Sequence, residues 1–284
     1  MSNQSPIPLS HLGVLRFTGN DALSFLQGQV SNDTQRLNGN SALRAAYSSP
    51  QGRVLALIYL LRHSSGIVAI LPREILAATM ERMRKFILRA KVQIEDAGDS
   101  LGVGGFIGAA PPSGYAEEDG VGLVPVGNDP GRSWVIGPPD KLPSWKDAAE
   151  ARRCEEAWRL ADIRAGLPQI YAATSEAFVA QMLNLDLLDG ISFTKGCYTG
   201  QEIIARAQHR GRVKRRLCRL QLPPGEWQVG QGLRLTDGRA GRLTETAISG
   251  GGYEALAVLS VEAAEDEAPA GLVAAAPLPL PYAL

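Results

Sequence analysis

Residues 195–202 read KGCYTGQE, and this stretch is the most informative part of the 284-residue chain. Thr199 and Glu202 have the spacing of a capping box, and residues 203–209 continue without a helix breaker, so we expect a helix to begin here. Cys197 then lies just outside the helix N-terminus, where unpaired N–H groups favour a thiolate. The residues alone leave a second interpretation open, in which the segment is a structural turn with a small buried cysteine.

The octapeptide resembles the signature of the YgfZ-type folate-binding proteins, which are relatives of the glycine-cleavage T-protein and act in iron–sulfur cluster maintenance. Other stretches resemble further blocks of the same family, in the same order and over nearly the whole chain. These stretches are residues 25–33 (FLQGQVSND), 163–168 (IRAGLP), 184–186 (NLD), 190–193 (GISF) and 278–282 (LPLPY). The resemblance therefore depends on one highly specific motif and several less specific ones.

The resemblance implies an α+β fold of the T-protein type, with two sheet-containing lobes and a C-terminal β-barrel around a central folate cavity. We expect the folate-binding region to cover residues 1–212, in lobes of approximately 1–100 and 101–212, and the barrel to cover residues 213–284. The residues themselves support the last part, because short apolar alternations and regular turn signals after Gly211 are typical of a small β-barrel.

The family's function implies a tetrahydrofolate-binding accessory factor that supports the assembly or repair of iron–sulfur clusters in client enzymes, including tRNA-modifying enzymes. Cys197 is the expected redox or cluster-facing thiol, held partly ionised by Lys195. Tetrahydrofolate or a derivative is the expected cofactor. The residues expected to form its site are Trp158, Lys195, Gly196, Tyr198, Gly200, Gln201, Glu202 and Arg206. Trp158 has an alternative role as an ordinary core residue.

Aminomethyl transfer, the T-protein reaction, is the main alternative function. That family places a catalytic aspartate in a strand after a glycine, and the matching stretch here is residues 52–57 (GRVLAL). The aspartate position is apolar and falls at or near Ala56, which cannot act as a general acid or base. Arg164 also stands where related proteins often carry a glutamate. We therefore expect no transferase chemistry.

RNA binding is a second alternative, because positive charge is concentrated in one region. Residues 195–219 hold eight Lys or Arg and one acid, whereas residues 220–284 hold three Arg and eight acids. A basic cluster of this kind attracts phosphates, but residues 210–216 lack interleaved aromatic residues and match no RNA-binding module. We expect the cluster to meet an anionic ligand tail or a partner protein, and nucleic acid not to be a partner.

The composition excludes several other classes of protein. The three cysteines (154, 197 and 218) and three histidines have no metal-ligand spacing, so we expect no resident metal or cluster. Sparse cysteines indicate a reducing compartment. No signal peptide is expected in residues 1–12, and the longest apolar run, residues 54–61, is too short to cross a bilayer. We expect a cytoplasmic monomer whose partners are folate and iron–sulfur client proteins.

Local patterns predict several individual elements. Residues 14–18, 54–61 and 67–71 read as strands, the last two as antiparallel neighbours. A helix is expected to open at Pro72, with an apolar stripe of Leu76, Met80, Met83 and Ile87, and another over residues 145–156. Residues 102–108 (GVGGFIG) fail the dinucleotide-binding fingerprint and are expected to form a glycine-rich strand.

Overall fold

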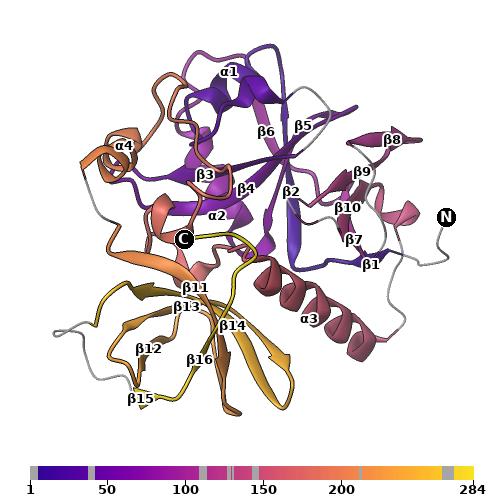
Figure 1. Cartoon of the computed structure of the whole chain (residues 1–284). Helices are drawn as coiled ribbons and strands as arrows, with labels where there is room; N and C mark the ends of the chain where they lie inside the picture. The colour runs from indigo at the N-terminus through magenta and orange to yellow at the C-terminus, as the bar shows by residue number, and fades with distance from the viewer. Residues whose placement is uncertain are drawn as a thin grey trace. The chain divides into compact units, whose positions relative to one another are not determined.

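The computed structural model of the chain describes residues 6–37, 42–108, 114–126, 129, 131–142, 147–210, 213–263 and 272–284 (Figure 1). The chain forms two compact units, each assembled from separate stretches of sequence. The first unit is Met1–Tyr47, Ala56–Glu155 and Gly190–Thr199, and the second is Ser48–Leu55, Glu156–Asp189 and Gly200–Leu284. The expected domain boundaries at residues 100 and 212 stay predictions, and residue 212 lies outside the described residues.

The first unit contains a five-stranded sheet in the order β3-β4-β5-β2-β6. Its strands are β2 (Leu12–Thr18), β3 (Leu43–Ser48), β4 (Val54–His63), β5 (Gly66–Pro72) and β6 (Gln93–Asp96). β4 and β5 form the expected antiparallel hairpin, with Leu60 opposite Ala69. Both strands are almost continuously apolar because both of their faces are buried.

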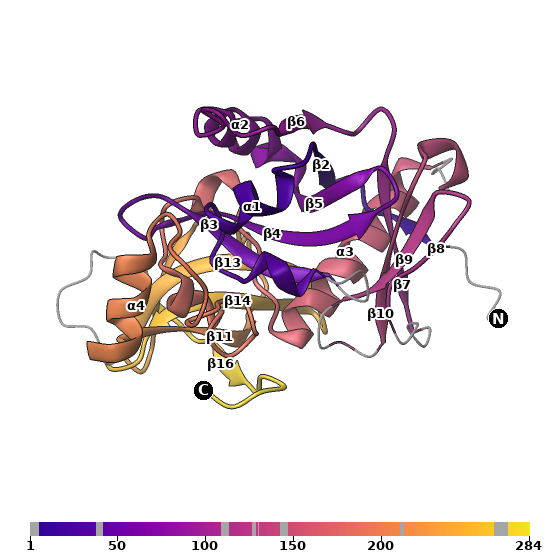
Figure 2. The same ribbon diagram turned by 90° about the horizontal axis from the view of Figure 1, so that it is seen from above.

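The first unit also contains helices α1 (Ala22–Gln27) and α2 (Arg73–Arg84). α2 packs against β2, β5 and β6, as Figure 2 shows, and buries Leu76 and Met83. The expected apolar stripe is correct up to Met83, but Ile87 lies beyond the helix. Pro72 is extended (ψ 131°) and ends β5, so it is the N-cap and not the expected first-turn residue.

A second five-stranded sheet of the first unit has the order β1-β7-β10-β9-β8. Its strands are β1 (Ile7–Pro8), β7 (Gly102–Ile107), β8 (Ala116–Glu118), β9 (Val121–Pro125) and β10 (Arg132–Gly137). The glycine-rich stretch is therefore a strand, as expected. Gly104 packs closely on β1, because a Cβ there would lie 3.2 Å from the Ile7 carbonyl oxygen.

Helix α3 (Ala148–Ala165) begins within the expected range but continues nine residues past the expected end at Glu156. Trp145, the expected first residue, lies outside the described residues. No glycine or proline occurs before Gly166, so nothing in the local sequence ends the helix earlier. Gly166 has a φ of +65°, the usual conformation of a residue that follows a helix C-terminus.

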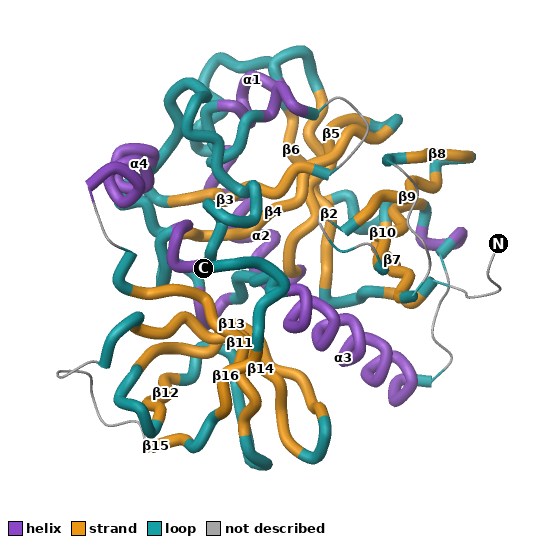
Figure 3. The backbone as a smooth tube through the Cα atoms, viewed as in Figure 1, coloured by secondary structure: helices purple, strands orange, loops and turns teal. Residues whose placement is uncertain are grey.

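The second unit is built on a six-stranded sheet in the order β15-β12-β13-β14-β11-β16 (Figure 3). Its strands are β11 (Arg215–Leu222), β12 (Gly232–Leu235), β13 (Ala240–Ser249), β14 (Gly252–Ser260), β15 (Leu272–Val273) and β16 (Ala276–Leu278). Leucine side chains from β11, β12, β13 and β14 form its buried core. The same unit contains helix α4 (Gln201–Arg210).

Short 3-10 turns complete the described secondary structure. They are η1 (Thr34–Arg36), η2 (Pro139–Lys141), η3 (Ala172–Thr174) and η4 (Ala180–Leu183). Among the described residues, no helix is both long enough and apolar enough to span a membrane.

Candidate functional site

The segment that contains Cys197 is a loop of the first unit, and it is fixed to residues 28–32 by several hydrogen bonds. Ser192 donates its backbone N–H to the Ser31 carbonyl over 3.0 Å, and Thr199 donates its own to the Gly28 carbonyl over 3.3 Å. The Ser31 hydroxyl donates to the Gly190 carbonyl over 2.6 Å and is buried. Residues 25–33 and 195–202, two separate blocks of the family resemblance, therefore meet in the structure.

Lys195 is the centre of this junction. Its ammonium donates to the carbonyl oxygens of Gln27 at 2.6 Å, Val30 at 2.7 Å and Asn32 at 2.9 Å. Gln27 ends α1, so one of these bonds satisfies a helix C-terminal carbonyl. Burial lowers the pKa of the Lys195 ammonium to about 8, although the Asp33 carboxylate acts in the opposite direction. All three N–H donors of the ammonium are used within the protein.

Cys197 is exposed, whereas two residues that flank it in the signature are buried. Lys195 is 8% exposed and Tyr198 is 8% exposed. The Lys195 nitrogen lies 4.9 Å from the centre of the Tyr198 ring, a cation–π distance. The loop is therefore held by residues on both sides of the cysteine, and the thiol itself faces outward.

The other two cysteines have different surroundings. Cys154 and Cys218 are each partly buried. Burial and the nearby Glu150 raise the pKa of the Cys154 thiol, and burial raises the pKa of the Cys218 thiol. Cys218 also packs against the leucine core of the six-stranded sheet. A raised thiol pKa reduces the thiolate fraction and therefore the reactivity at neutral pH.

The helix after the signature begins one residue later than the sequence predicted. α4 starts at Gln201, so Gly200 precedes it and Thr199 lies too early for the expected capping box with Glu202. Gly200 has a φ of +84°, and a Cβ there would lie 2.6 Å from the Ser49 carbonyl oxygen and 3.0 Å from the Gly52 Cα. Close packing on this turn accounts for the glycine, and the left-handed conformation moves the start of the helix.

The remaining predicted folate residues lie in different environments. Gln201 is half-buried, Glu202 and Arg206 are exposed on α4, and open space surrounds the Cα of Gly196. Trp158 lies in α3 and is only 1% exposed, among the largest fully buried side chains described. Its placement fits the core role that the sequence left open, and its expected contact with folate stays a prediction.

A carboxylate cluster in the second unit involves Arg164. Glu254 of β14 accepts hydrogen bonds from Arg164 at 2.8 Å, from Arg219 at 2.5 Å and from the Ser249 hydroxyl at 2.9 Å. Burial alone raises the pKa of the Glu254 carboxyl, but these hydrogen bonds outweigh it and bring the pKa to about 2. Arg164 thus binds a carboxylate of its own chain.

The basic cluster that suggested RNA binding is partly neutralised within the same unit. Arg216 makes a two-point contact with Asp186, at 2.7 and 2.9 Å, and Arg219 binds Glu254. Arg212 and the side chain of Arg210 lie outside the described residues. Lys214 is exposed. Arg216 and Arg219, two of the eight basic residues of this region, therefore form ion pairs within the protein.

Three stretches of the family resemblance also meet in the second unit. The Tyr282 hydroxyl donates to the Gly166 carbonyl over 2.8 Å, and the Asn184 amide lies 3.4 Å from the same hydroxyl. Asn184 also donates to the Leu217 carbonyl over 3.0 Å. Residues 163–168, 184–186 and 278–282 thus form one hydrogen-bonded group.

Ala56, at or near the expected position of the T-protein aspartate, is fully buried in β4, and the correspondence itself stays a prediction. Among the described residues, no group of three or more His, Cys, Asp or Glu side chains is arranged to hold a metal ion.

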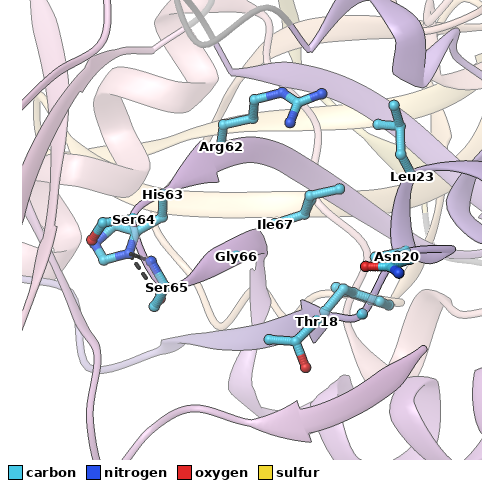
Figure 4. A pocket seen from close by; sticks show the side chains of 12 residues that line it. Thr18, Asn20, Leu23, Arg62, His63, Ser64, Ser65, Gly66 and Ile67 are labelled. Carbon is cyan, nitrogen blue, oxygen red and sulfur yellow. Dashed lines mark hydrogen bonds between the residues drawn. The ribbon is translucent and has the colours of Figure 1, made fainter. Parts of the chain in front are cut away.

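A hollow of mixed polar and apolar lining in the first unit was not expected from the sequence. It has a volume of about 600 Å³ and lies beside the β4–β5 turn, where Asn20, Arg62 and Ile67 are among its lining residues (Figure 4). The His63 Nδ1 accepts the Ser65 backbone N–H at 3.1 Å and lies 2.8 Å from the Ser65 hydroxyl. Its Nε2 lies 3.7 Å from Glu117. These contacts stabilise the two-residue turn.

Comparisons with known proteins agree with this architecture. No family model matches the chain. It is 33% identical over 264 residues to the tRNA-modifying protein YgfZ of Enterobacter sp. (strain 638), covering 86% of this chain and 80% of that protein. It is 30% identical over 249 residues to the protein of the same name from Hamiltonella defensa subsp. Acyrthosiphon pisum (strain 5AT), covering 81% and 71%.

Among solved structures, the glycine cleavage system aminomethyltransferase T from Bartonella henselae superposes with a TM-score of 0.64 at 14% sequence identity. The match covers 90% of this chain and 78% of that one. This likeness confirms the expected T-protein-like α+β fold.

Proposed function

Because this chain belongs to the YgfZ family of tRNA-modifying proteins, we propose that it is a tetrahydrofolate-binding accessory factor for iron–sulfur clusters. It supports the assembly or repair of clusters in client enzymes, among them enzymes that modify tRNA. Cys197 is its functional thiol, and it acts in the cytoplasm.

The exposure of Cys197 on a fixed loop carries this proposal. A thiol that must meet a client protein or its cluster has to be accessible, and Cys197 is exposed while Cys154 and Cys218 are partly buried. The three carbonyl bonds of Lys195 hold the loop without involving the sulfur. Lys195 therefore positions the thiol, and its ammonium is not available to a folate carboxylate.

The residues of α4 fit a folate better than Lys195 does. Arg206 is exposed and offers a cation for a glutamate tail, and Gln201 lies half-buried at the start of the same helix. A bound folate would supply a one-carbon carrier at this place. The buried Ala56 provides no acid or base for aminomethyl transfer, so the proposed role is binding without that reaction.

Complementation of a bacterial strain that lacks its own family member tests the thiol. We expect Cys197→Ser to abolish iron–sulfur-dependent tRNA modification while its thermal melting stays unchanged. Cys154→Ser and Cys218→Ser are matched controls that should retain function. Alkylation of single-cysteine variants should be fastest at Cys197. Full complementation by Cys197→Ser would overturn the assignment.

Calorimetry with tetrahydrofolate tests the ligand separately. We expect Arg206→Gln to weaken binding of a polyglutamylated folate more than binding of the monoglutamate, because only the longer tail adds carboxylates. Methylene-tetrahydrofolate formation at about 1 s⁻¹ or faster with an aminomethyl donor protein would instead establish the transferase alternative.

A further inference from the structure

The turn after α2 combines positive charge with exposed apolar side chains. Residues 82–94 contain five basic residues and no acid, and the apolar run Phe86-Ile87-Leu88 lies at their centre. The basic residues are Arg82, Arg84, Lys85, Arg89 and Lys91. The proposed function uses none of this segment, which belongs to the first unit.

The apolar side chains in this turn are displayed to solvent. Leu88 is 90% exposed and Phe86 is 41% exposed, which is unusual for neighbouring large hydrophobic residues. Leu88 also has a φ of 42°, a left-handed conformation that is strained for a branched side chain. Because its own fold buries so little of this strained residue, Leu88 is a candidate for contact with a ligand.

Defined hydrogen bonds hold the turn in this conformation. The Phe86 N–H donates to the Met83 carbonyl over 3.0 Å, and the Ala90 N–H donates to the Ile87 carbonyl over 2.8 Å. The Lys91 N–H donates to the Asp21 carboxylate over 2.7 Å. Leu88 therefore lies in an ordered turn that is bound to the end of α2 on one side and to Asp21, the residue before α1, on the other.

The cations of the segment divide into structural and exposed ones. Arg84 binds the Ile94 carbonyl over 2.7 Å and the Glu81 carboxylate over 2.7 Å, so it closes the turn. Lys85, Arg89 and Lys91 are exposed around the apolar tip. The outer face of the turn thus presents two apolar side chains within a group of positive charges.

We propose that residues 85–91 bind an anionic phospholipid surface, with Phe86 and Leu88 inserted among the lipid headgroups and the three exposed cations beside lipid phosphates. This combination of Phe or Leu with Lys and Arg is that of interfacial membrane segments. Protein–protein interfaces are depleted in Lys. Leu88 is the most exposed apolar side chain of the turn, and an aliphatic chain favours lipid over a stacked base, whereas Phe86 and Arg89 could serve either ligand, so RNA binding is an outcome of the test below. The contact would be weak and reversible, because only two side chains insert.

Vesicle sedimentation of the full chain tests this proposal. We expect binding to vesicles of phosphatidylglycerol and phosphatidylcholine, and little binding to phosphatidylcholine alone. High salt should weaken the binding. Lys85→Gln and Arg89→Gln should each lower the partition coefficient about fivefold.

Leu88→Gly separates binding from folding. Glycine adopts a φ of 42° without strain, and this relief offsets the greater freedom that glycine gives the unfolded chain, so the variant should melt close to the temperature of the unchanged protein. It should nevertheless lower the vesicle partition coefficient about tenfold, because the apolar anchor is lost. Leu272→Ala is the matched control, since Leu272 is 71% exposed in the second unit and should have no effect.

Three results would overturn the proposal. The first is equal binding to neutral and anionic vesicles, or none to either. The second is an equal loss from Leu272→Ala. The third is unchanged vesicle binding by Leu88→Gly and Lys85→Gln together with weakened binding of a tRNA transcript, which would assign the turn to RNA. None of these results depends on Cys197 or folate, so failure here leaves the proposed function untouched.

Discussion

Lys195 in the first unit and Glu254 in the second are both buried charges, but the two units stabilise them by different means. Lys195 is bound by three neutral backbone carbonyls, whereas Glu254 is bound by two arginines and a hydroxyl. Neutral acceptors compensate only part of the desolvation of a charge, and opposite charges compensate more than all of it here. The pKa of the Lys195 ammonium is therefore lowered, which favours the neutral amine. The pKa of the Glu254 carboxyl is also lowered, which favours the charged carboxylate.

The largest expected effect is that of Lys195→Met. The substitution leaves three inward-facing carbonyls without a donor, so we expect the free energy of unfolding to fall by about 3 kcal/mol or more. Urea unfolding at pH 7 measures it. Lys214→Met makes the same chemical change at an exposed site and should cost less than about 0.5 kcal/mol. Equal losses in the two variants would show that the carbonyl bonds of Lys195 do not contribute to the free energy of unfolding.

Glu254→Gln should have the next largest effect, a loss of about 2 kcal/mol at pH 7, because two arginines lose their carboxylate. The folded-state pKa of about 2 is below the ordinary value of 4.5. The stabilisation is therefore complete above pH 4.5 and disappears as the pH falls toward 2. Urea unfolding at a series of acidic pH values should show the two proteins converging. Glu226→Gln, at an exposed glutamate, is the control.

The contribution of Lys195 to stability should change at alkaline pH. Its folded-state pKa of about 8 is below the ordinary 10.5, so between these values the unfolded chain holds more protons and stability rises with pH. We expect a gain of about 1 kcal/mol, because the carbonyl bonds favour the charged ammonium and oppose the effect of burial. Comparing Lys195→Met with the unchanged protein from pH 7 to pH 10.5 isolates this gain. A flat difference would mean that the carbonyls compensate burial fully.

Arg164→Lys should have the smallest effect, below about 1 kcal/mol. The Arg164 side chain is 52% exposed, so solvent screens its pairing with Glu254, and Arg219 keeps the carboxylate bound. A lysine cannot reproduce the branched contact of Arg164 with Glu254 and Ser249, so the effect should still be measurable by thermal melting. A loss as large as that of Glu254→Gln would show that Arg164 is the main partner.

Local patterns in the sequence determined several features of this protein. The apolar runs of β4 and β5 and the turn between them predicted a hairpin, because strand burial and turn chemistry act over a few residues. The strands after residue 213 were predicted for the same reason. The KGCYTGQE motif selected Cys197 among three cysteines, and it is the cysteine that the structure exposes.

Other features depended on tertiary structure. The carbonyl partners of Lys195 are 163 to 168 residues away in sequence, and no spacing rule predicts contacts at such separations. The start of α4 was placed one residue early because the turn that packs on Gly200 comes from residues 49–52. The sequence analysis included Arg216 and Arg219 in a basic cluster that meets an anionic ligand or partner, because a sequence does not show which acids will pair with them in the fold. The sequence by itself thus determined which side chains are present and which short elements they form. Only the folded chain decided which of these side chains bind groups of the protein itself and which remain exposed to a partner.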